Sequence, residues 1–231
     1  MKLFKKIREI CIIGVGRFGQ AIVQKLLSDR ENNIRLVIVD QEEKPLLQFK
    51  DEVDSIYIAD CADRRTLESI NIKEFDVVIV ATSDNIEIVA ALSEMGVNTI
   101  IARASNPRHA RVLRQIGVTY IVSPEEEAGK KTAILVSDNA LTHFSENIVE
   151  IQDEFVSSSI YIKNPELFNK KIGELDLRNK YDVSVSLIKR NSKFFLPSGN
   201  FEILENDLIT FIGKLEDIIK VTQYCTKEAK K

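Results

Sequence analysis

The stretch "EICIIGVGRFGQAIVQKLL" at residues 9–27 decides how this chain folds. Its first part is an unbroken apolar run, which is typical of a buried strand, and the part after the glycines repeats apolar residues at helical spacing. The order strand, glycine loop, helix brings bare backbone N–H groups and the positive end of a helix dipole to one edge of a sheet. The stretch therefore predicts a binding site for an anion.

The spacing of the glycines indicates which anion. Gly14, Gly16 and Gly19 form the pattern G-x-G-x-x-G, in which the first glycine allows a tight turn, the second lets a pyrophosphate approach the backbone and the third lets the helix pack closely. Asp40 ends the next apolar run, where a ribose hydroxyl pair would lie. This acid suits ATP, ADP or NAD(H) and argues against NADP, whose 2′-phosphate would face it. The alternative is that the glycines only turn the chain.

Strand-like runs and helical patterns alternate over the first half of the chain. The runs are 9–14, 35–40, 54–60, 75–82, 98–104 and 118–123. Continuous apolar strands of this kind belong to parallel sheets that are covered on both faces. We therefore predict an α/β fold with a Rossmann-type doubly wound parallel sheet, which binds ligands at the carboxyl ends of its strands.

The pattern changes after about residue 123. One longer helix is predicted over 123–144, and beyond residue 150 shorter strands at 157–164, 182–190, 193–199 and 207–213 precede a last helix at 214–225. This arrangement predicts a small, separate α+β domain. The expected division is a nucleotide-binding domain at 1–140, a linker at 141–150 and a second domain at 151–231.

Three more side chains are predicted near the glycine loop. Arg17 lies at the mouth of the helix, where a guanidinium can pair bidentately with a phosphate chain, although a solvated surface arginine would look the same. Asp60 and Asp84 follow the third and fourth strands and so reach the same edge of the sheet. Each could accept hydrogen bonds from a base or sugar, or could cap the helix that follows it.

Composition excludes several classes of protein. The chain has 231 residues, of which 44% are hydrophobic, and its apolar runs fall far short of the roughly 20 residues that cross a bilayer. The start of the chain does not resemble a signal peptide. A net charge of −3 with interspersed signs disfavours nucleic-acid binding, and the three cysteines have no metal-site or disulfide spacing. We expect a soluble protein of a reducing cytoplasm, with Cys11 as a small buried side chain.

The sequence favours a binding module over an enzyme. A small NAD-dependent oxidoreductase with a Rossmann fold, the main alternative, needs an acid or base beside the nicotinamide. His109 is interpreted as a solvated helix-surface residue and His143 as part of the linker region. A redox-sensing repressor would require a basic DNA-reading element, and none is visible in the sequence.

Several segments in the same order resemble one known family. They are "CIIGVGRFGQAIVQKL", "LVIVDQEE", "ADCADRRTLESINIKEFDVVIVATSDN", "VLRQIGVTYIVSPEEEAGKKTA", "LDLRNKYDVSVSLIKR" and "LPSGNFEILENDLITFIG". Together they resemble the RCK (KTN) family, the cytoplasmic regulatory subunits of Ktr/Trk potassium uptake systems. The resemblance implies a homo-oligomer of dimers in an octameric ring, which lies at the inner face of the membrane and gates a potassium channel subunit.

The resemblance also implies a set of ligand-binding residues. The glycines would hold phosphates, Arg17 the terminal phosphate, and Asp40 the ribose of ATP, ADP or NAD(H). The implied nucleotide-site residues are Gly14, Gly16, Arg17, Phe18, Gly19, Asp40, Ala59, Asp60, Cys61, Ala81, Thr82, Arg103 and Ala104.

Two further sites are implied by the resemblance. Glu125, in "SPEEE", matches a segment that in some members helps to hold a divalent cation or Na⁺ between subunits, and it would also suit the first turn of a helix. Several members sense cyclic-di-AMP with the C-terminal domain. For that ligand, Arg178 and Asn179 would meet phosphates, and an apolar floor would be formed by Ile160, Ile162 and Pro197.

Overall fold

The computed structural model describes residues 8–28, 33–136, 138–152 and 154–227. The chain forms two compact units, Met1–Glu126 and Glu127–Lys231, which we call the N-terminal and C-terminal units. This division lies before the predicted domain end at residue 140. The predicted linker at 141–150 is not an open connection, because Leu141 and Ile148 are fully buried in the core of the C-terminal unit.

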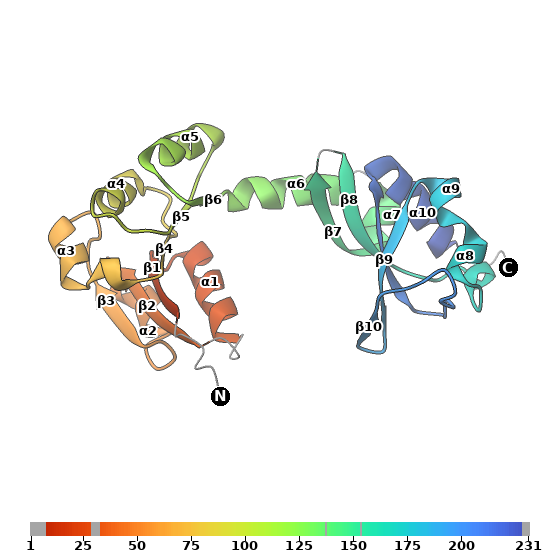
Figure 1. Cartoon of the computed structure of the whole chain (residues 1–231), viewed down its shortest axis with the longest axis horizontal. Coiled ribbons are helices and arrows are strands. Elements are labelled where there is room, and N and C mark those ends of the chain that lie inside the picture. Colours follow the sequence, from red (N-terminus) through yellow and green to blue (C-terminus); the bar gives the residue numbers. More distant parts are fainter. Residues whose placement is uncertain (1–7, 29–32, 137, 153, 228–231) are drawn as a thin grey trace, which may run out of the picture. The chain divides into compact units, whose positions relative to one another are not determined.

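The N-terminal unit contains the predicted parallel sheet (Figure 1). Its strands are β1 (Arg8–Ile13), β2 (Ile34–Asp40), β3 (Ser55–Ile58), β4 (Val77–Val80), β5 (Ile100–Arg103) and β6 (Tyr120–Val122). They are ordered β3-β2-β1-β4-β5-β6, and every pairing is parallel. The order reverses between β1 and β4, so loops diverge there and leave room for a ligand.

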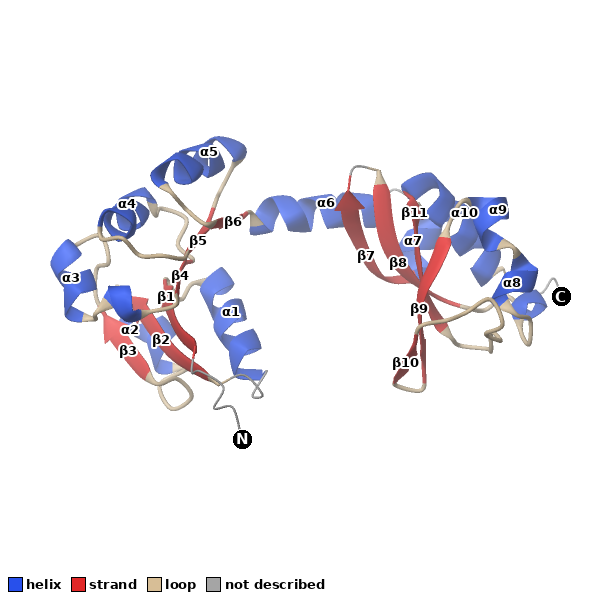
Figure 2. Cartoon of the chain, in the orientation of Figure 1, coloured by secondary structure: helices blue, strands red, loops and turns tan. Residues whose placement is uncertain are grey.

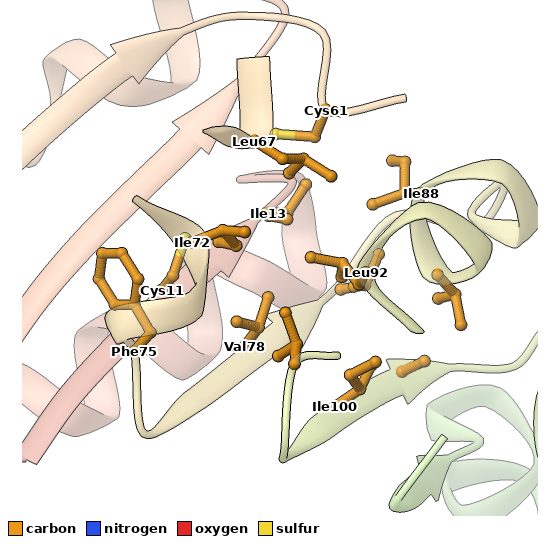
Figure 3. Close-up of a cluster of buried hydrophobic side chains, with 14 of the residues drawn as sticks. Cys11, Ile13, Cys61, Leu67, Ile72, Phe75, Val78, Ile88, Leu92 and Ile100 are labelled. Atoms are coloured by element: carbon orange, nitrogen blue, oxygen red, sulfur yellow. The ribbon is translucent and has the colours of Figure 1, made fainter. Parts of the chain in front are cut away.

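Helices cover both faces of this sheet. They are α1 (Arg17–Ser28), α2 (Glu43–Leu47), α3 (Arg64–Ser69), a 3₁₀ turn η1 (Ile72–Glu74), α4 (Ile86–Glu94) and α5 (Pro107–Ile116). Ile10 and Ile12 of β1 pack with α1 and α2, whereas Cys11 and Ile13 pack with α3, α4 and α5. Figure 3 shows the second of these clusters. The Rossmann-type doubly wound fold is therefore confirmed, and so is the burial of Cys11.

The C-terminal unit is built around an antiparallel sheet (Figure 2). Its strands are β7 (Ser145–Gln152), β8 (Phe155–Tyr161), β9 (Ser184–Arg190), β10 (Lys193–Phe195) and β11 (Leu208–Lys214), in the order β10-β9-β11-β8-β7. The helices are α6 (Pro124–Val136), which begins at the end of the N-terminal unit, α7 (Asn139–Phe144), η2 (Pro165–Leu167), α8 (Ile172–Leu175), α9 (Leu177–Tyr181) and α10 (Leu215–Thr226). The predicted α+β class of this unit is confirmed.

Two local predictions differ from the structure. The single helix predicted over 123–144 is two helices, α6 and α7, and the strand β7 was not predicted. No described residue of α6 is buried, whereas Leu141 of α7 is fully buried, so a separate helix is needed to bury Leu141. The hydroxyl of Thr142 donates to the carbonyl of Leu135 at 2.7 Å and so ties the two helices together. Within the described ranges, no helix has the length and apolar character needed to cross a membrane.

Candidate functional site

A cavity of about 800 Å³ lies where the strand order of the N-terminal unit reverses. We call it the glycine-loop cavity. Of the predicted nucleotide-site residues, it is lined by Gly16, Arg17, Asp40, Ala81, Thr82 and Arg103. These residues come from the loop after β1 and from the ends of β2, β4 and β5, so one cavity unites side chains that are far apart in the sequence. Its volume lies within the range that holds small-molecule ligands.

Of the three glycines in the loop, Gly16 has open space beside its backbone, whereas Gly14 and Gly19 lie close to neighbouring atoms. Gly14 has a φ of +91°, and a Cβ there would collide with the side chain of Thr82. A Cβ at Gly19 would collide with the carbonyl oxygen of Gly14, so the start of α1 packs directly on the loop. A Cβ at Gly16 would meet no atom within 4 Å, because Gly16 faces the cavity. The backbone at Gly16 is therefore the part of the loop that a ligand can approach.

The N-terminus of α1 offers hydrogen-bond donors to the cavity. In the described parts of the chain, no group accepts a hydrogen bond from the amide N–H of Arg17 or Phe18. The side chain of Gln20 donates to the carbonyl of Val15 at 3.0 Å and so holds the loop against the helix. Free amides and the helix dipole both favour an anion at this end of α1.

Asp40 is held in place by the backbone before any ligand arrives. Its Oδ2 accepts a hydrogen bond from the amide of Val15 at 2.6 Å, and its Oδ1 accepts one from the amide of Glu42 at 3.0 Å. A carboxylate has about four acceptor sites, so each oxygen can still accept a hydroxyl donor. The half-buried carboxylate at the end of β2 can thus receive the two hydroxyls of a ribose.

Two buried polar atoms beside the cavity have no partner among the described residues. They are Oγ1 of Thr82 and Nε of Arg103. Leaving such a group unpaired costs about 1–3 kcal/mol, which a ligand that pairs with it can recover. The other end of the Arg103 guanidinium is not free, because Nη2 forms an ion pair with Glu125 at the start of α6.

Seven predicted nucleotide-site residues do not line this cavity: Gly14, Phe18, Gly19, Ala59, Asp60, Cys61 and Ala104. Phe18 packs against the cluster beneath α1, and Ala104 is 1% exposed. Cys61 is 2% exposed and points into the core in Figure 3. Burial, with a smaller contribution from the carboxylates of Asp60 and Asp40, raises the pKa of the Cys61 thiol to about 12.

The structure does not support the helix-capping alternative for Asp60 or Asp84. Asp60 is exposed and accepts a hydrogen bond from the amide of Ala62 at 2.9 Å, whereas the residue that caps α3 is Asp63. Asp84 lies in the loop before α4, where the N-cap position belongs to Asn85. Neither aspartate caps the following helix.

The structure adds cavity residues that the sequence analysis missed: Val15, Gln20, Glu42, Lys44, Pro45, Gln48 and Ser83. Four of them belong to the segment 42–48, which directly follows Asp40, so their nearness to the end of β2 was the available signal. With Lys44 the cavity has three cationic side chains, and with Glu42 it has two carboxylates. These cationic side chains and carboxylates suit an anionic ligand that also carries hydroxyl groups.

Glu125 forms an ion pair in the structure. Its carboxylate is 60% exposed and pairs with Arg103. Within the part of the chain that the structure describes, no group of three or more His, Cys, Asp or Glu side chains is arranged to hold a metal ion. The described residues of one chain therefore form no such ligand cluster at this point, and the Glu125 carboxylate is engaged by an arginine.

The residues predicted for a second messenger are only partly brought together. Arg178 and Pro197 line one hollow of about 330 Å³ beside α8 and α9, which we call the α8–α9 hollow. Asn179 donates from its amide to Asp176 at 2.6 Å and is not among the lining residues. Ile160 and Ile162 are fully buried in the core, so they form no floor for a ligand.

The prediction of a solvated surface position holds only in part for one histidine. His109 of α5 is half-buried and lines a surface hollow, and its ring nitrogens contact Asn85 and Ser105. His143 is exposed on α7. Neither histidine lines the glycine-loop cavity.

Comparisons with known proteins cover nearly the whole chain. The TrkA-N domain matches residues 10–124, and the TrkA-C domain matches residues 159–226. The chain is 32% identical over 228 residues to protein MG323 of Mycoplasma genitalium, which covers 96% of this chain and 97% of that protein. It is 31% identical over 217 residues to Ktr system potassium uptake protein C of Bacillus subtilis, which covers 91% and 94%.

A solved structure shares the fold. The GsuK channel bound to NAD superimposes with a TM-score of 0.62 and 18% sequence identity over 99% of this chain. The match covers 41% of the GsuK chain, so the present chain spans less than half of that channel.

Proposed function

This chain belongs to the Ktr/Trk potassium uptake family and carries both a TrkA-N and a TrkA-C domain, and on that premise we propose that it is a nucleotide-binding subunit that regulates a membrane potassium channel or transporter. One observation carries the nucleotide-binding part of the proposal. Thr82 and Arg103 line the same cavity as Gly16, and each carries a buried polar atom that has no partner among the described residues.

We infer that the ligand is ATP, ADP or NAD(H). The free amides at the start of α1, together with Arg17 and Arg103, suit a phosphate chain, and Asp40 suits a ribose with both hydroxyls free. The GsuK channel, which has the same fold, has been solved with NAD bound. An additional phosphate on the ribose would be repelled by Asp40, so NADP is not the expected ligand.

Regulation requires that the nucleotide bind one state of the assembly more tightly than another. A coupling of about 1–3 kcal/mol is typical of such systems. We propose that the chain forms dimers that assemble into an octameric ring at the cytoplasmic face of a membrane potassium channel subunit. In such a ring Glu125 could join carboxylates from other protomers to hold a divalent cation or Na⁺, in competition with its ion pair to Arg103.

A regulatory role fits the cavity better than hydride transfer does. The residues that line the glycine-loop cavity include no histidine or tyrosine, and the one lysine among them, Lys44, lies in the segment after β2 that follows the proposed ribose-binding Asp40. An oxidoreductase usually places such a side chain beside the nicotinamide as acid or base. We therefore propose binding without turnover.

We also propose a second ligand, bound in the α8–α9 hollow. Arg178 and Pro197 line it together, and Arg178 also donates to the hydroxyl of Ser184 at 2.9 Å. We propose cyclic-di-AMP as the ligand there, with Arg178 meeting a phosphate. The predicted contribution of Ile160 and Ile162 is dropped, because both side chains lie inside the core.

A thermal-shift panel with the purified full chain tests ligand binding. The ligands are ATP, ADP, AMP, NAD, NADH, NADP and cyclic-di-AMP, and binding at one hundred times Kd stabilises the folded state by about 2.7 kcal/mol. We expect ATP, ADP or NAD(H) to raise the Tm, and NADP to have no effect. No shift with any adenine nucleotide would contradict the proposed site, and steady consumption of NADH with small carbonyl compounds would favour the oxidoreductase.

Regulation is tested separately by potassium flux. Vesicles that contain the membrane subunit are measured alone, with this chain, and with this chain plus nucleotide. We expect flux that depends on both the chain and the nucleotide. Flux that is the same in all three preparations would contradict the regulatory role even if the nucleotide binds.

A further inference from the structure

Asn85 ties together the two strand ends that carry the unpartnered atoms. Its side chain is 1% exposed and is not used to cap α4, although Asn85 occupies the N-cap position. Instead, its amide nitrogen donates to the carbonyl oxygens of Thr82 and Arg103, both at 2.8 Å. Thr82 lies just after β4 and Arg103 ends β5, so one buried amide bridges two segments whose residues Thr82 and Arg103 line the glycine-loop cavity.

His109 completes this arrangement from α5. Its Nε2 lies 3.1 Å from Oδ1 of Asn85, and its Nδ1 lies 3.3 Å from the amide nitrogen and 2.9 Å from the hydroxyl oxygen of Ser105. A backbone N–H can only donate, so Nδ1 must be the acceptor and Nε2 must carry the proton. The Asn85 orientation agrees, because its two carbonyl partners require NH₂ on one side and leave the oxygen to accept from His109.

We propose that Asn85 and His109 are positioning residues of the nucleotide site, which hold Thr82 and Arg103 so that Oγ1 and Nε face the ligand. This inference rests on the proposed nucleotide-binding function. The chain of contacts runs from Ser105 through His109 and Asn85 to the two carbonyls, and both N–H donors of the Asn85 amide are used in it. Neither Asn85 nor His109 lines the cavity, so both act through Thr82 and Arg103.

The geometry explains why a histidine and an asparagine are paired here. Asn85 has a buried amide whose oxygen needs a donor, and the Nε2–H of His109 is the donor that reaches it. Without that donor the amide can rotate, and the bridge between the carbonyls of Thr82 and Arg103 is lost. The Arg103 guanidinium would then follow its pairing with Glu125 rather than the ligand.

Two substitutions of His109 distinguish its hydrogen bond to Asn85 from its hydrogen bonds to Ser105. In His109→Gln the side-chain amide nitrogen can take the place of Nε2 and donate to Asn85. In His109→Asn the shorter side chain can take the place of Nδ1 and accept from Ser105, but it cannot reach Asn85. The two variants are matched in chemistry and in helix position, so a general loss of stability should affect both.

The experiment measures ADP and adenosine affinity by titration calorimetry on the full chain, together with the Tm. We expect His109→Gln to bind ADP within about threefold of wild type, and His109→Asn and Asn85→Ala to lose about tenfold or more. The loss should be larger for ADP than for adenosine, because Arg103 carries the positive charge. If Asn85→Ala does not fold, the comparison of ADP affinity between the two His109 variants is sufficient to test the proposal.

The outcomes separate this inference from the proposed function. Wild-type affinity for ADP in both His109 variants would overturn the positioning role while leaving the nucleotide site intact. Equal losses in both variants, matched by equal losses of Tm, would show a structural role only and would also overturn it. Absence of ADP and NAD binding by the wild-type chain would overturn the proposed function and this inference with it.

Discussion

The amide of Val15 donates to Oδ2 of Asp40 at 2.6 Å, and this hydrogen bond joins the glycine loop to the end of β2. Hydrogen bonds to a carboxylate are short and roughly twice as strong as those between neutral groups. The carboxylate is thereby oriented by the protein itself, and its remaining lone pairs face the cavity that Asp40 lines. One residue thus shapes the loop and presents an oriented carboxylate at the cavity where we propose that a ribose binds.

Substitution of Asp40 should therefore change both stability and ligand choice. Asp40→Asn keeps an acceptor for Val15 but loses one for Glu42, so the free energy of unfolding should fall by about 1–2 kcal/mol. NAD affinity should fall about tenfold, and the preference for NAD over NADP should shrink because the negative charge is gone. Calorimetric titration with both dinucleotides measures this. An unchanged preference would show that Asp40 does not face the 2′ position.

Gly16 and Gly19 should respond in opposite ways to the same substitution. Gly16→Val should keep the fold, because a Cβ there meets no atom within 4 Å, but it should abolish nucleotide binding by filling the open face of the loop. Gly19→Val should destabilise the fold by about 3 kcal/mol, because its Cβ collides with the carbonyl of Gly14. Chemical unfolding and an ATP titration of each variant test this. ATP and NADH binding by Gly16→Val at wild-type strength would refute the site.

Arg17 should discriminate between nucleotides by their number of phosphates. Its side chain is exposed at the start of α1 and lines the glycine-loop cavity. Arg17→Ala should weaken ATP by about tenfold and AMP by much less, because a guanidinium pairs best with outer phosphates. Lys25, near the far end of α1, provides a control substitution of similar charge. Equal losses of affinity for ATP and AMP would show that Arg17 does not contact the outer phosphates.

Because its thiols are buried, we expect the protein to lose stability in alkaline solution. Burial raises the pKa of Cys61 and of Cys225 to about 12. An unfolded thiol titrates near pH 8.5, so above that pH the unfolded chain loses a proton that the folded chain keeps. The free energy of unfolding should then fall as pH rises from about 8.5 to 12, by about 1.4 kcal/mol per pH unit for each thiol.

Urea unfolding at several pH values measures this slope. Cys61→Ala should reduce the slope for the N-terminal unit, and Cys225→Ala should reduce it for the C-terminal unit, since each thiol lies in one of the two units. A slope that is identical in the wild type and both variants would mean that the thiols ionise in the folded protein as readily as in the unfolded chain.

Much of the fold was determined by local sequence. The alternating apolar runs located the six described strands of the N-terminal unit to within a few residues, because the central strands β1, β2 and β4 are largely buried and the edge strands β3 and β6 are also mostly apolar. The glycine spacing and Asp40 located the cavity, because turn geometry and strand ends are set by neighbours in the chain. Arg17 and Gly16 belong to the same local signal, and both line the cavity.

The features that only the tertiary structure determined involve residues that are far apart in the sequence. The family resemblance implied ligand contacts for Cys61 and Ile160, yet the turn after β3 buries Cys61 in one core and β8 buries Ile160 in the other. His109 reaches Asn85, 24 residues away, and Arg103 reaches Glu125 across 22 residues. A hydrogen bond or ion pair of this kind has no periodic signature, because it is fixed by the packing of one helix or strand end on another rather than by the order of residues along the chain.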